Sequence, residues 1–234
     1  MVTFVVCHGA WSAGWAWGKV RPLMRARGHE MVTPTYTGLG ERAHLASPAV
    51  DLALHIQDVL AVIEMEALSD IVLVGHSYGG MVATGVADRA RSRITKLIYV
   101  DAFVPEDGQS LQDLAPHRPL NPPPQAEGGP PADWLMMPNP SPLDTRPEDL
   151  AWIAPRRKPQ PRLTFTQKLV LENGPLTLPR AYVYCNRKDT GDPFAQFRRL
   201  KDEPGWEYVE MEASHSPNIT APRELVDILL RLAG

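Results

Sequence analysis

The chain has 234 residues, of which 44% are hydrophobic and 22% charged, a composition that suits one globular domain with an ordinary buried core, or at most two. The formal net charge of -3 leaves no basic excess, which disfavours nucleic acid and membrane surfaces as partners and favours small molecules. The two cysteines, Cys7 and Cys185, lie inside apolar runs, where a thiol is typical of a small buried hydrophobic group rather than of a disulfide or a metal site.

Short β-branched runs alternate along the chain with longer stretches in which apolar residues recur at three- and four-residue steps. The runs that predict strands are Val2–Cys7, Met31–Thr35, Ile71–Val74, Ile94–Val100, Ala181–Cys185 and Glu207–Met211. The stretches that predict helices are Trp15–Arg27, Leu52–Glu66, Met81–Arg89, Phe194–Lys201 and Leu225–Leu232. This alternation predicts an α/β fold, in which helices cover a mostly parallel sheet.

The first predicted strand leads directly into His8, Gly9, Ala10 and Trp11. Gly9 allows this loop to approach a substrate closely, and the backbone N–H of Ala10 is a candidate donor to an oxyanion hole. Trp11 is a candidate residue of the substrate pocket. The strand is too short to span a membrane and lacks the basic start of a signal peptide, so a cytoplasmic protein is expected.

The third predicted strand leads into the pentapeptide Gly75–Gly79, which satisfies Gly-x-Ser-x-Gly between a strand and a helix. A sharp turn at this place holds the serine in a strained conformation, and the flanking glycines remove side chains that would collide with neighbouring backbone. Ser77 is therefore the candidate nucleophile. The N–H of Tyr78, at the start of the helix, is the candidate second donor to the oxyanion hole.

A serine hydroxyl needs a base, and two histidines are candidates. His76 is adjacent to the serine, but neighbouring side chains diverge on such a turn, so we expect His76 to pack against loops and line the pocket. His215 follows the last predicted strand and precedes the last helix. The chain order of serine then histidine fits hydrolases built on this kind of sheet, which makes His215 the predicted base.

The base in turn needs a carboxylate that fixes its tautomer. Asp101 ends the fourth predicted strand, so it should emerge beside the serine at the same edge of the sheet. Asp189 follows the fifth strand, with Asp192 close behind, and either can reach the histidine. We favour Asp101 because an acid that ends a buried strand is desolvated and fixed, whereas Asp189, the alternative acid, lies in a charged loop beside Lys188.

The alternation stops over residues 105–162, which contain 15 of the 24 prolines. Such density excludes a central strand. Large apolar side chains are interleaved with the prolines, which is unusual for a disordered linker, the alternative interpretation. We therefore expect an ordered lid, inserted into a core of residues 1–104 and 163–234, in which Trp134 and Met137 line a pocket for an apolar or aromatic substrate.

Four motifs resemble the α/β-hydrolase superfamily, and within it the esterase and hydroxynitrile-lyase branch that includes plant methylesterases and their bacterial relatives. The motifs are His8–Trp11 with Gly14–Trp17, Gly75–Met81, Asp101–Pro105 and Ser214–His215. The resemblance implies cleavage of small carboxylic esters through an acyl-enzyme, without a metal or an organic cofactor. Plant members usually carry the acid after the fifth strand, which favours Asp189, whereas bacterial relatives often keep an aspartate where Asp101 stands, so the resemblance leaves the acid open.

Other functions of this fold are disfavoured by residue identity. Hydroxynitrile lyases of this kind use a threonine after the first-strand histidine and a lysine after the catalytic histidine, and here these places hold Gly9 and Ser216. Epoxide hydrolases and dehalogenases need an aspartate in place of Ser77. A non-catalytic ligand receptor is expected to lose a member of the triad. Lactones, thioesters and carbon–carbon bonds next to a carbonyl stay alternative substrates, and the oligomeric state, a homodimer included, stays open.

Overall fold

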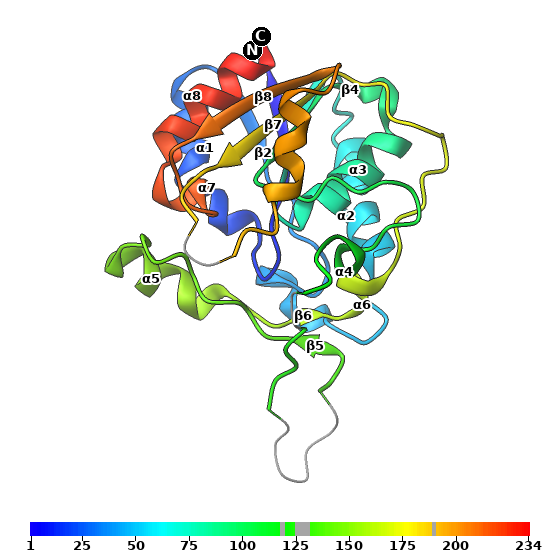
Figure 1. The fold of residues 1–234 in the computed structure, drawn as a ribbon, viewed down its shortest axis with the longest axis vertical. Coiled ribbons are helices and arrows are strands. Elements are labelled where there is room, and N and C mark those ends of the chain that lie inside the picture. Colours follow the sequence, from blue (N-terminus) through cyan, green and yellow to red (C-terminus); the bar gives the residue numbers. More distant parts are fainter. Residues whose placement is uncertain (118–119, 125–131, 189–190) are drawn as a thin grey trace.

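The computed structural model describes residues 1–117, 120–124, 132–188 and 191–234. Its centre is a parallel sheet of six strands in the order β2-β1-β3-β4-β7-β8 (Figure 1). The bounds are Thr3–Cys7 for β1, Glu30–Val32 for β2, Ile71–His76 for β3, Ile94–Val100 for β4, Arg180–Cys185 for β7 and Trp206–Met211 for β8. The predicted α/β fold with a mostly parallel sheet is confirmed.

Strand side chains alternate between two hydrophobic clusters, one on each face of the sheet. Along β1, Phe4 and Val6 belong to one cluster, whereas Val5 and Cys7 belong to the other. Successive residues of a strand point to opposite faces, so a strand covered on both faces is an unbroken apolar run. Cys185 joins the Phe4 cluster, and both cysteines are buried and free, as predicted.

Helices cover both faces of this sheet (Figure 1). Their bounds are Gly14–Trp17 for the 3₁₀ helix η1, Val20–Ala26 for α1, Gly40–Leu45 for η2, Leu52–Met65 for α2, Gly79–Arg89 for α3, Arg91–Arg93 for η3, Leu163–Thr166 for α6, Ala195–Lys201 for η5, Pro217–Thr220 for α7 and Pro222–Ala233 for α8. Helices α1 and α8 contribute to the Phe4 cluster, and α2, α3 and η5 contribute to the opposite one.

Two predicted elements differ from the structure for reasons of backbone chemistry. The helix predicted over residues 15–27 is split into η1 and α1, because Pro22 lacks the N–H that would bond one turn back and is tolerated only in the first turn of α1. Strand β2 ends at Val32 rather than at Thr35, since Pro34 cannot donate a ladder hydrogen bond.

The proline-rich insertion, residues 105–162, lies beyond the edge of the sheet at which the parallel strands end (Figure 1). Its described elements are α4 (Leu111–Leu114), β5 (Leu135–Met136), α5 (Pro147–Ile153), η4 (Ala154–Arg156) and β6 (Gln160–Pro161). Strands β5 and β6 pair only with each other, in an antiparallel ladder, so no described residue of the insertion joins the main sheet. Helix α5 is not predicted, because the sequence around it is rich in proline. It begins at Pro147, and proline is favoured in a first helical turn.

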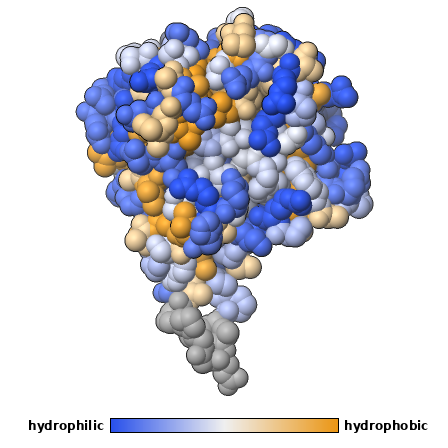
Figure 2. All heavy atoms as spheres, turned by 180° about the vertical axis from the view of Figure 1, so that it is seen from behind, coloured by the Kyte–Doolittle hydropathy of each residue, from blue (hydrophilic) through white to orange (hydrophobic). Residues whose placement is uncertain are grey.

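The face opposite to the view of Figure 1 is mostly polar, with apolar side chains scattered over it (Figure 2). Such scatter is ordinary for the exposed side of a folded domain, because polar atoms never cover a protein surface completely. In the part of the chain that the structure describes, no helix combines the length and the apolar character that crossing a membrane requires.

Candidate active site

Ser77 lies in the turn between β3 and α3, with a φ of 56° in the left-handed region. In a residue other than glycine this backbone conformation is strained, and such strain is common at functional sites. The turn also presses against β1, because a Cβ added to Gly79 would lie 2.0 Å from the carbonyl oxygen of Cys7. The glycine of the motif is therefore required by close packing, and the serine is lifted beyond the end of the strand.

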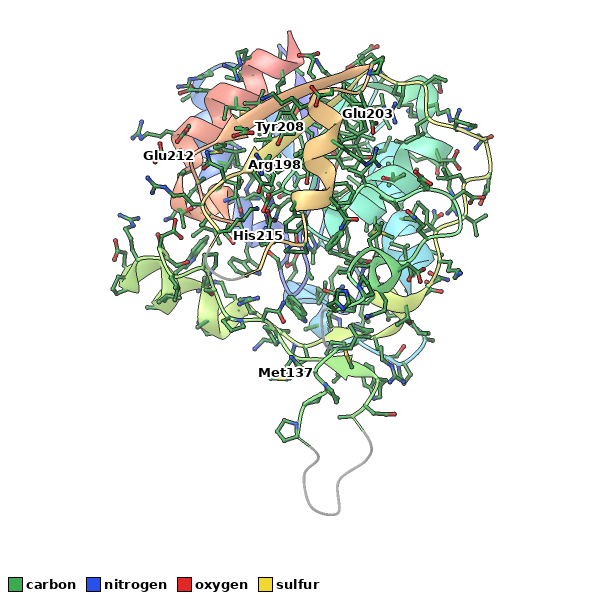
Figure 3. All side chains as sticks on the ribbon, in the orientation of Figure 1. Met137, Arg198, Glu203, Tyr208, Glu212 and His215 are labelled. Carbon is green, nitrogen blue, oxygen red and sulfur yellow. The ribbon has the colours of Figure 1, made fainter. Side chains whose placement is uncertain are left out.

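A chain of hydrogen bonds links Ser77, His215 and Asp101. His215 Nε2 lies 2.9 Å from Ser77 Oγ, and His215 Nδ1 lies 2.7 Å from Asp101 Oδ2. Since a carboxylate only accepts, Nδ1–H donates to Asp101 and Nε2 is left to accept the serine proton. The histidine lies in the loop after β8, at the sheet edge that faces the insertion (Figure 3). The structure thus brings together the three residues that the sequence favours.

The carboxylate of Asp101 is fully buried and surrounded by donors. Besides His215, the backbone N–H of Cys185 donates to Oδ1 at 3.2 Å, and Lys188 Nζ lies 2.7 Å from Oδ1 and 2.9 Å from Oδ2. Burial raises the pKa of Asp101, but the hydrogen bonds and charges of His215 and Lys188 outweigh burial and hold this pKa below its usual value. Asp101 is therefore ionised at neutral pH.

Of the other two candidate acids, the structure describes Asp192, which has partners other than the histidine. Asp192 accepts hydrogen bonds from the Tyr184 hydroxyl and from the backbone N–H of Phe194, and its Oδ1 lies 3.5 Å from Lys188 Nζ. Asp189 lies outside the described residues. The geometry accordingly pairs His215 with Asp101.

His76 contacts both the backbone and the ring of His215. Its Nε2–H donates to the backbone carbonyl of His215 at 2.7 Å, and the two ring centroids lie 5.1 Å apart. Burial, reinforced by the neighbouring His215, lowers the pKa of His76 to about 3. His76 is thus neutral and holds the loop of His215 in place, and it also lines the cavity described below.

The loop after β1 is tied to the insertion. The backbone N–H of Trp11 donates to Gln160 Oε1 at 2.8 Å, and its indole N–H donates to the carbonyl of Met136 at 2.8 Å. Trp11 also has a positive φ, 56°. In the described part of the chain no hydrogen bond occupies the N–H of Ala10 or Tyr78, the two predicted oxyanion donors. Nothing in the sequence pattern predicts that Gln160, 149 residues from Trp11, holds this loop in place.

A cavity that is partly open to solvent lies against Ser77 and His215, and its empty space, open solvent included, is about 650 Å³. The core contributes aromatic and polar walls, and the insertion contributes the opposite side. Lining residues that the sequence did not assign to the pocket include Trp15, Asn139, Pro140, Ile153, Arg157 and Asn218.

Of the four predicted pocket residues, His76 and Trp11 line this cavity. Trp134 and Met137 are not among its described lining residues, so their predicted place differs from the structure. Met137 directly follows β5, and side chains alternate in direction along an extended chain, so Met136 is 2% exposed whereas Met137 is 37% exposed. Met137 instead borders a smaller adjoining hollow, and the backbone carbonyl of Trp134 accepts a hydrogen bond from Arg162.

Within the described ranges, no group of three or more His, Cys, Asp or Glu side chains has an arrangement that would hold a metal ion. The chemistry that this site can perform with its own residues is nucleophilic attack by a serine whose proton is taken by histidine.

A buried stack of rings supports the site from beneath. The Tyr36 ring lies between the rings of His8 and His55, at centroid distances of 3.8 and 4.7 Å. His8 Nδ1–H donates to the carbonyl of Gly9 at 2.9 Å, and the Tyr78 hydroxyl donates to His55 Nδ1 at 2.9 Å. The stack therefore holds the backbone on which both predicted oxyanion donors lie. Burial is the main cause that lowers the pKa of His8 and of His55 to about 3.

These two histidines predict a loss of stability in weak acid. Each binds its proton near pH 6.5 in the unfolded chain but only near pH 3 in the folded one, so the unfolded state binds more protons between these values. The free energy of unfolding should fall as the pH falls through this window, by roughly 1.4 kcal/mol per pH unit for each histidine. Urea unfolding of His55→Gln at pH 7, 6 and 5 should give a shallower slope than the unmodified chain. His44→Gln, at an exposed position, serves as control, and an equal slope in the His55 variant would contradict the prediction.

Comparison with known proteins places this site in a family. The model of the alpha/beta hydrolase family matches residues 4–228. The carbendazim hydrolyzing esterase of Nocardioides sp. (strain SG-4G) is 42% identical over 243 residues, which cover 99% of this chain and 100% of that protein. Methylesterase 9 of Arabidopsis thaliana is 27% identical over 257 residues, covering 100% and 98%. The structure of an extracellular alpha/beta-hydrolase from a Paenibacillus species aligns over 99% of both chains with a TM-score of 0.80 and 23% identity. The chain belongs to the alpha/beta hydrolase family, among its carboxylic ester hydrolases.

Proposed function

We propose that the protein hydrolyses small carboxylic esters through an acyl-enzyme on Ser77, with His215 as the base and Asp101 as the acid. The observation that carries this proposal is the pair of hydrogen bonds on His215, 2.9 Å to the serine oxygen and 2.7 Å to the carboxylate. A non-catalytic receptor has no need of such an aligned chain. The positive φ of Ser77 points the same way, since strain of this kind persists where the surroundings enforce it.

The reaction follows from which atoms accept and donate. His215 Nε2 takes the hydroxyl proton as Ser77 Oγ attacks the ester carbonyl carbon, and the N–H groups of Ala10 and Tyr78 stabilise the resulting oxyanion. The protonated histidine then gives its proton to the departing alkoxide, which leaves as the alcohol. In the second half, His215 takes a proton from water, the hydroxide attacks the acyl-enzyme, and the proton returns to Ser77 as the acid is released. Asp101 stays ionised and stabilises the imidazolium throughout.

The cavity favours a flat substrate that also carries a polar group. Trp11 and Trp15 supply aromatic surface, while Arg157 and Asn218 supply polar atoms. Asn218 is 3% exposed, and its amide nitrogen donates to the carbonyl of Ala16, so the side chain is held in the wall of the cavity. The similarity to the carbendazim hydrolyzing esterase makes carbendazim a test substrate, beside simple aryl esters.

We infer further that residues 105–162 act as a cap over this cavity. Six of the lining residues belong to it: Asn139, Pro140, Ser141, Pro142, Ile153 and Arg157. Helix α5 is fastened to the core by the ion pair of Asp149 with Lys19 and by the edge contact between Trp152 and Trp15, whose centroids lie 5.3 Å apart. A fastened segment that also builds a wall of the site is typical of a substrate-binding insertion.

The proposal is tested by covalent labelling and by substrate choice. A fluorophosphonate should modify the purified protein once, and mass spectrometry of the digested protein should place the adduct on Ser77. A panel of p-nitrophenyl acetate, a methyl ester, a lactone, a thioester and carbendazim should show ester turnover ahead of lactone and thioester turnover. The proposal fails if the protein neither takes the label nor turns over any ester. Turnover of the lactone or thioester alone would keep the nucleophile but change the substrate class.

A further inference from the structure

Lys188, in the loop after β7, contacts the carboxylate of Asp101 as a second close basic group besides His215. Its Nζ lies 2.7 Å from Oδ1 and 2.9 Å from Oδ2, so it bridges both oxygens. The lysine side chain is 17% exposed and the aspartate side chain is 0% exposed. Two aromatic rings confine the ammonium group, since Nζ lies 4.6 Å from the ring centroid of Tyr184 and 5.2 Å from that of Phe194. A long, flexible side chain is thus held in one position.

We propose that Lys188 is a positioning residue of the reaction: it fixes the Asp101 carboxylate against His215 and sets the pH range over which His215 is a neutral base. The inference rests on the proposed function, because it assigns to Lys188 an effect on a base whose role is itself proposed. The sequence singles out Lys188 only as the neighbour that makes the loop of Asp189 charged.

The orienting effect follows from the hydrogen-bond geometry. Oδ2 of Asp101 accepts from His215 and from Lys188, while Oδ1 accepts from Lys188 and from the N–H of Cys185. A carboxylate held by three donors cannot rotate without breaking several charge-assisted bonds. Phe194 contacts both side chains, since its ring centroid lies 5.2 Å from Lys188 Nζ and its ring stacks on that of His215 at a centroid distance of 4.9 Å and an angle of 16°.

The electrostatic effect has a definite sign. Asp101 favours the imidazolium form of His215, whereas the positive charge of Lys188 disfavours it. Lys188 therefore partly offsets the attraction of Asp101 for a proton on His215. Because the serine can be activated only by neutral His215, the activity should extend further into the acid range when the lysine is present.

No other described cation makes this contact with the pair. The titratable and charged groups that face Asp101 and His215 from the packed elements are His76 from β3, Tyr182, Tyr184 and Cys185 from β7, Arg187, Lys188 and Asp192 from the loop after β7, and Glu212 from the loop after β8. Burial keeps His76 neutral by lowering its pKa, and it keeps the tyrosines and the cysteine neutral by raising theirs. Arg187 is paired with Glu212 at an exposed position. Lys188 is therefore the cation whose removal should be felt by the base.

The test is the pH profile of kcat/KM for p-nitrophenyl acetate between pH 5 and 9. In Lys188→Met the acid limb should move to higher pH by roughly half a pH unit to one pH unit, and the plateau should fall about tenfold. Lys188→Arg keeps the charge and should restore the limb. Lys188→Gln keeps a hydrogen-bond donor but not the charge, so its acid limb should move as in Lys188→Met. If Lys188→Met does not fold, the acid limb of Lys188→Gln tests the inference in its place. Lys201→Met, at an exposed position in η5, should change neither quantity.

A purely structural lysine would lower the melting temperature of Lys188→Met and of Lys188→Gln while leaving the acid limb in place. That outcome, or a limb that moves equally in Lys188→Arg, would overturn the inference. Failure of the proposed function is seen separately, because it shows in the unmodified protein as an absence of labelling and of ester turnover. An active, labelled protein with unmoved acid limbs would sink the role of Lys188 alone.

Discussion

Ser77→Ala is expected to lower kcat for p-nitrophenyl acetate by about 10⁶-fold and to abolish fluorophosphonate labelling. The variant removes the hydroxyl group that the aligned histidine deprotonates, since His215 Nε2 has Ser77 Oγ as its hydrogen-bond partner at 2.9 Å. What remains is the stabilisation of an oxyanion formed by water, which accounts for the small residual rate in enzymes that lose their nucleophile. Steady-state turnover and gel fluorescence of the labelled protein measure the two effects.

The same variant separates loss of chemistry from loss of fold. Alanine has the same backbone conformational preferences as serine at a φ of 56°, so the melting temperature should change by only a few degrees. Ser69→Ala, at an exposed position before β3, is the matched control and should keep full activity. Turnover of Ser77→Ala within tenfold of the unmodified protein would show that some other group, or water acting directly, attacks the ester.

The sequence pattern is sufficient for the sheet and for the residues at its edge. A parallel strand covered on both faces must be apolar throughout, so an apolar run in the sequence identifies each strand. The residue after the run must lie at the carboxyl edge of the sheet. Ser77 and Asp101 follow neighbouring strands, and for this reason alone they lie close together. The fold and the aligned residues could therefore be predicted from local patterns and chain order.

The walls of the site could not be predicted in this way. Gln160 and Trp11 are 149 residues apart, and their contact depends on how the insertion folds back over the core. Trp134 is as large and apolar as any wall residue, but the size of a side chain does not decide which residues of the insertion line the cavity. Lys188 likewise has no local signal, because a lysine in a loop is usually solvated and only the tertiary structure brings it onto Asp101.

Asp101→Asn is expected to lower kcat by about 10⁴-fold, the second largest effect. An amide can present its NH₂ group to His215 Nδ1, and this hydrogen bond stabilises the tautomer in which Nδ1 accepts and Nε2 carries the proton. That tautomer cannot take the proton of Ser77. The variant also removes the negative charge that stabilises the imidazolium in the transition state. Steady-state kinetics at saturating p-nitrophenyl acetate measure the loss.

The control for Asp101→Asn is the same substitution at the alternative acid, Asp189. Asp189→Asn should leave kcat within a few-fold of the unmodified protein if Asp101 is the partner of the base, and a 10⁴-fold loss in that variant instead would reverse the assignment. Asp101→Asn also leaves the ammonium group of Lys188 with Asp192, at 3.5 Å, as its remaining acidic partner, and a largely buried charge that loses its closer partner destabilises a fold. Kinetics should therefore be measured below the melting temperature of the variant. Combining Asp101→Asn with Lys188→Met also removes the charge of the lysine. The double variant should recover stability but not activity. That result would separate the structural role of the aspartate from its role in the reaction.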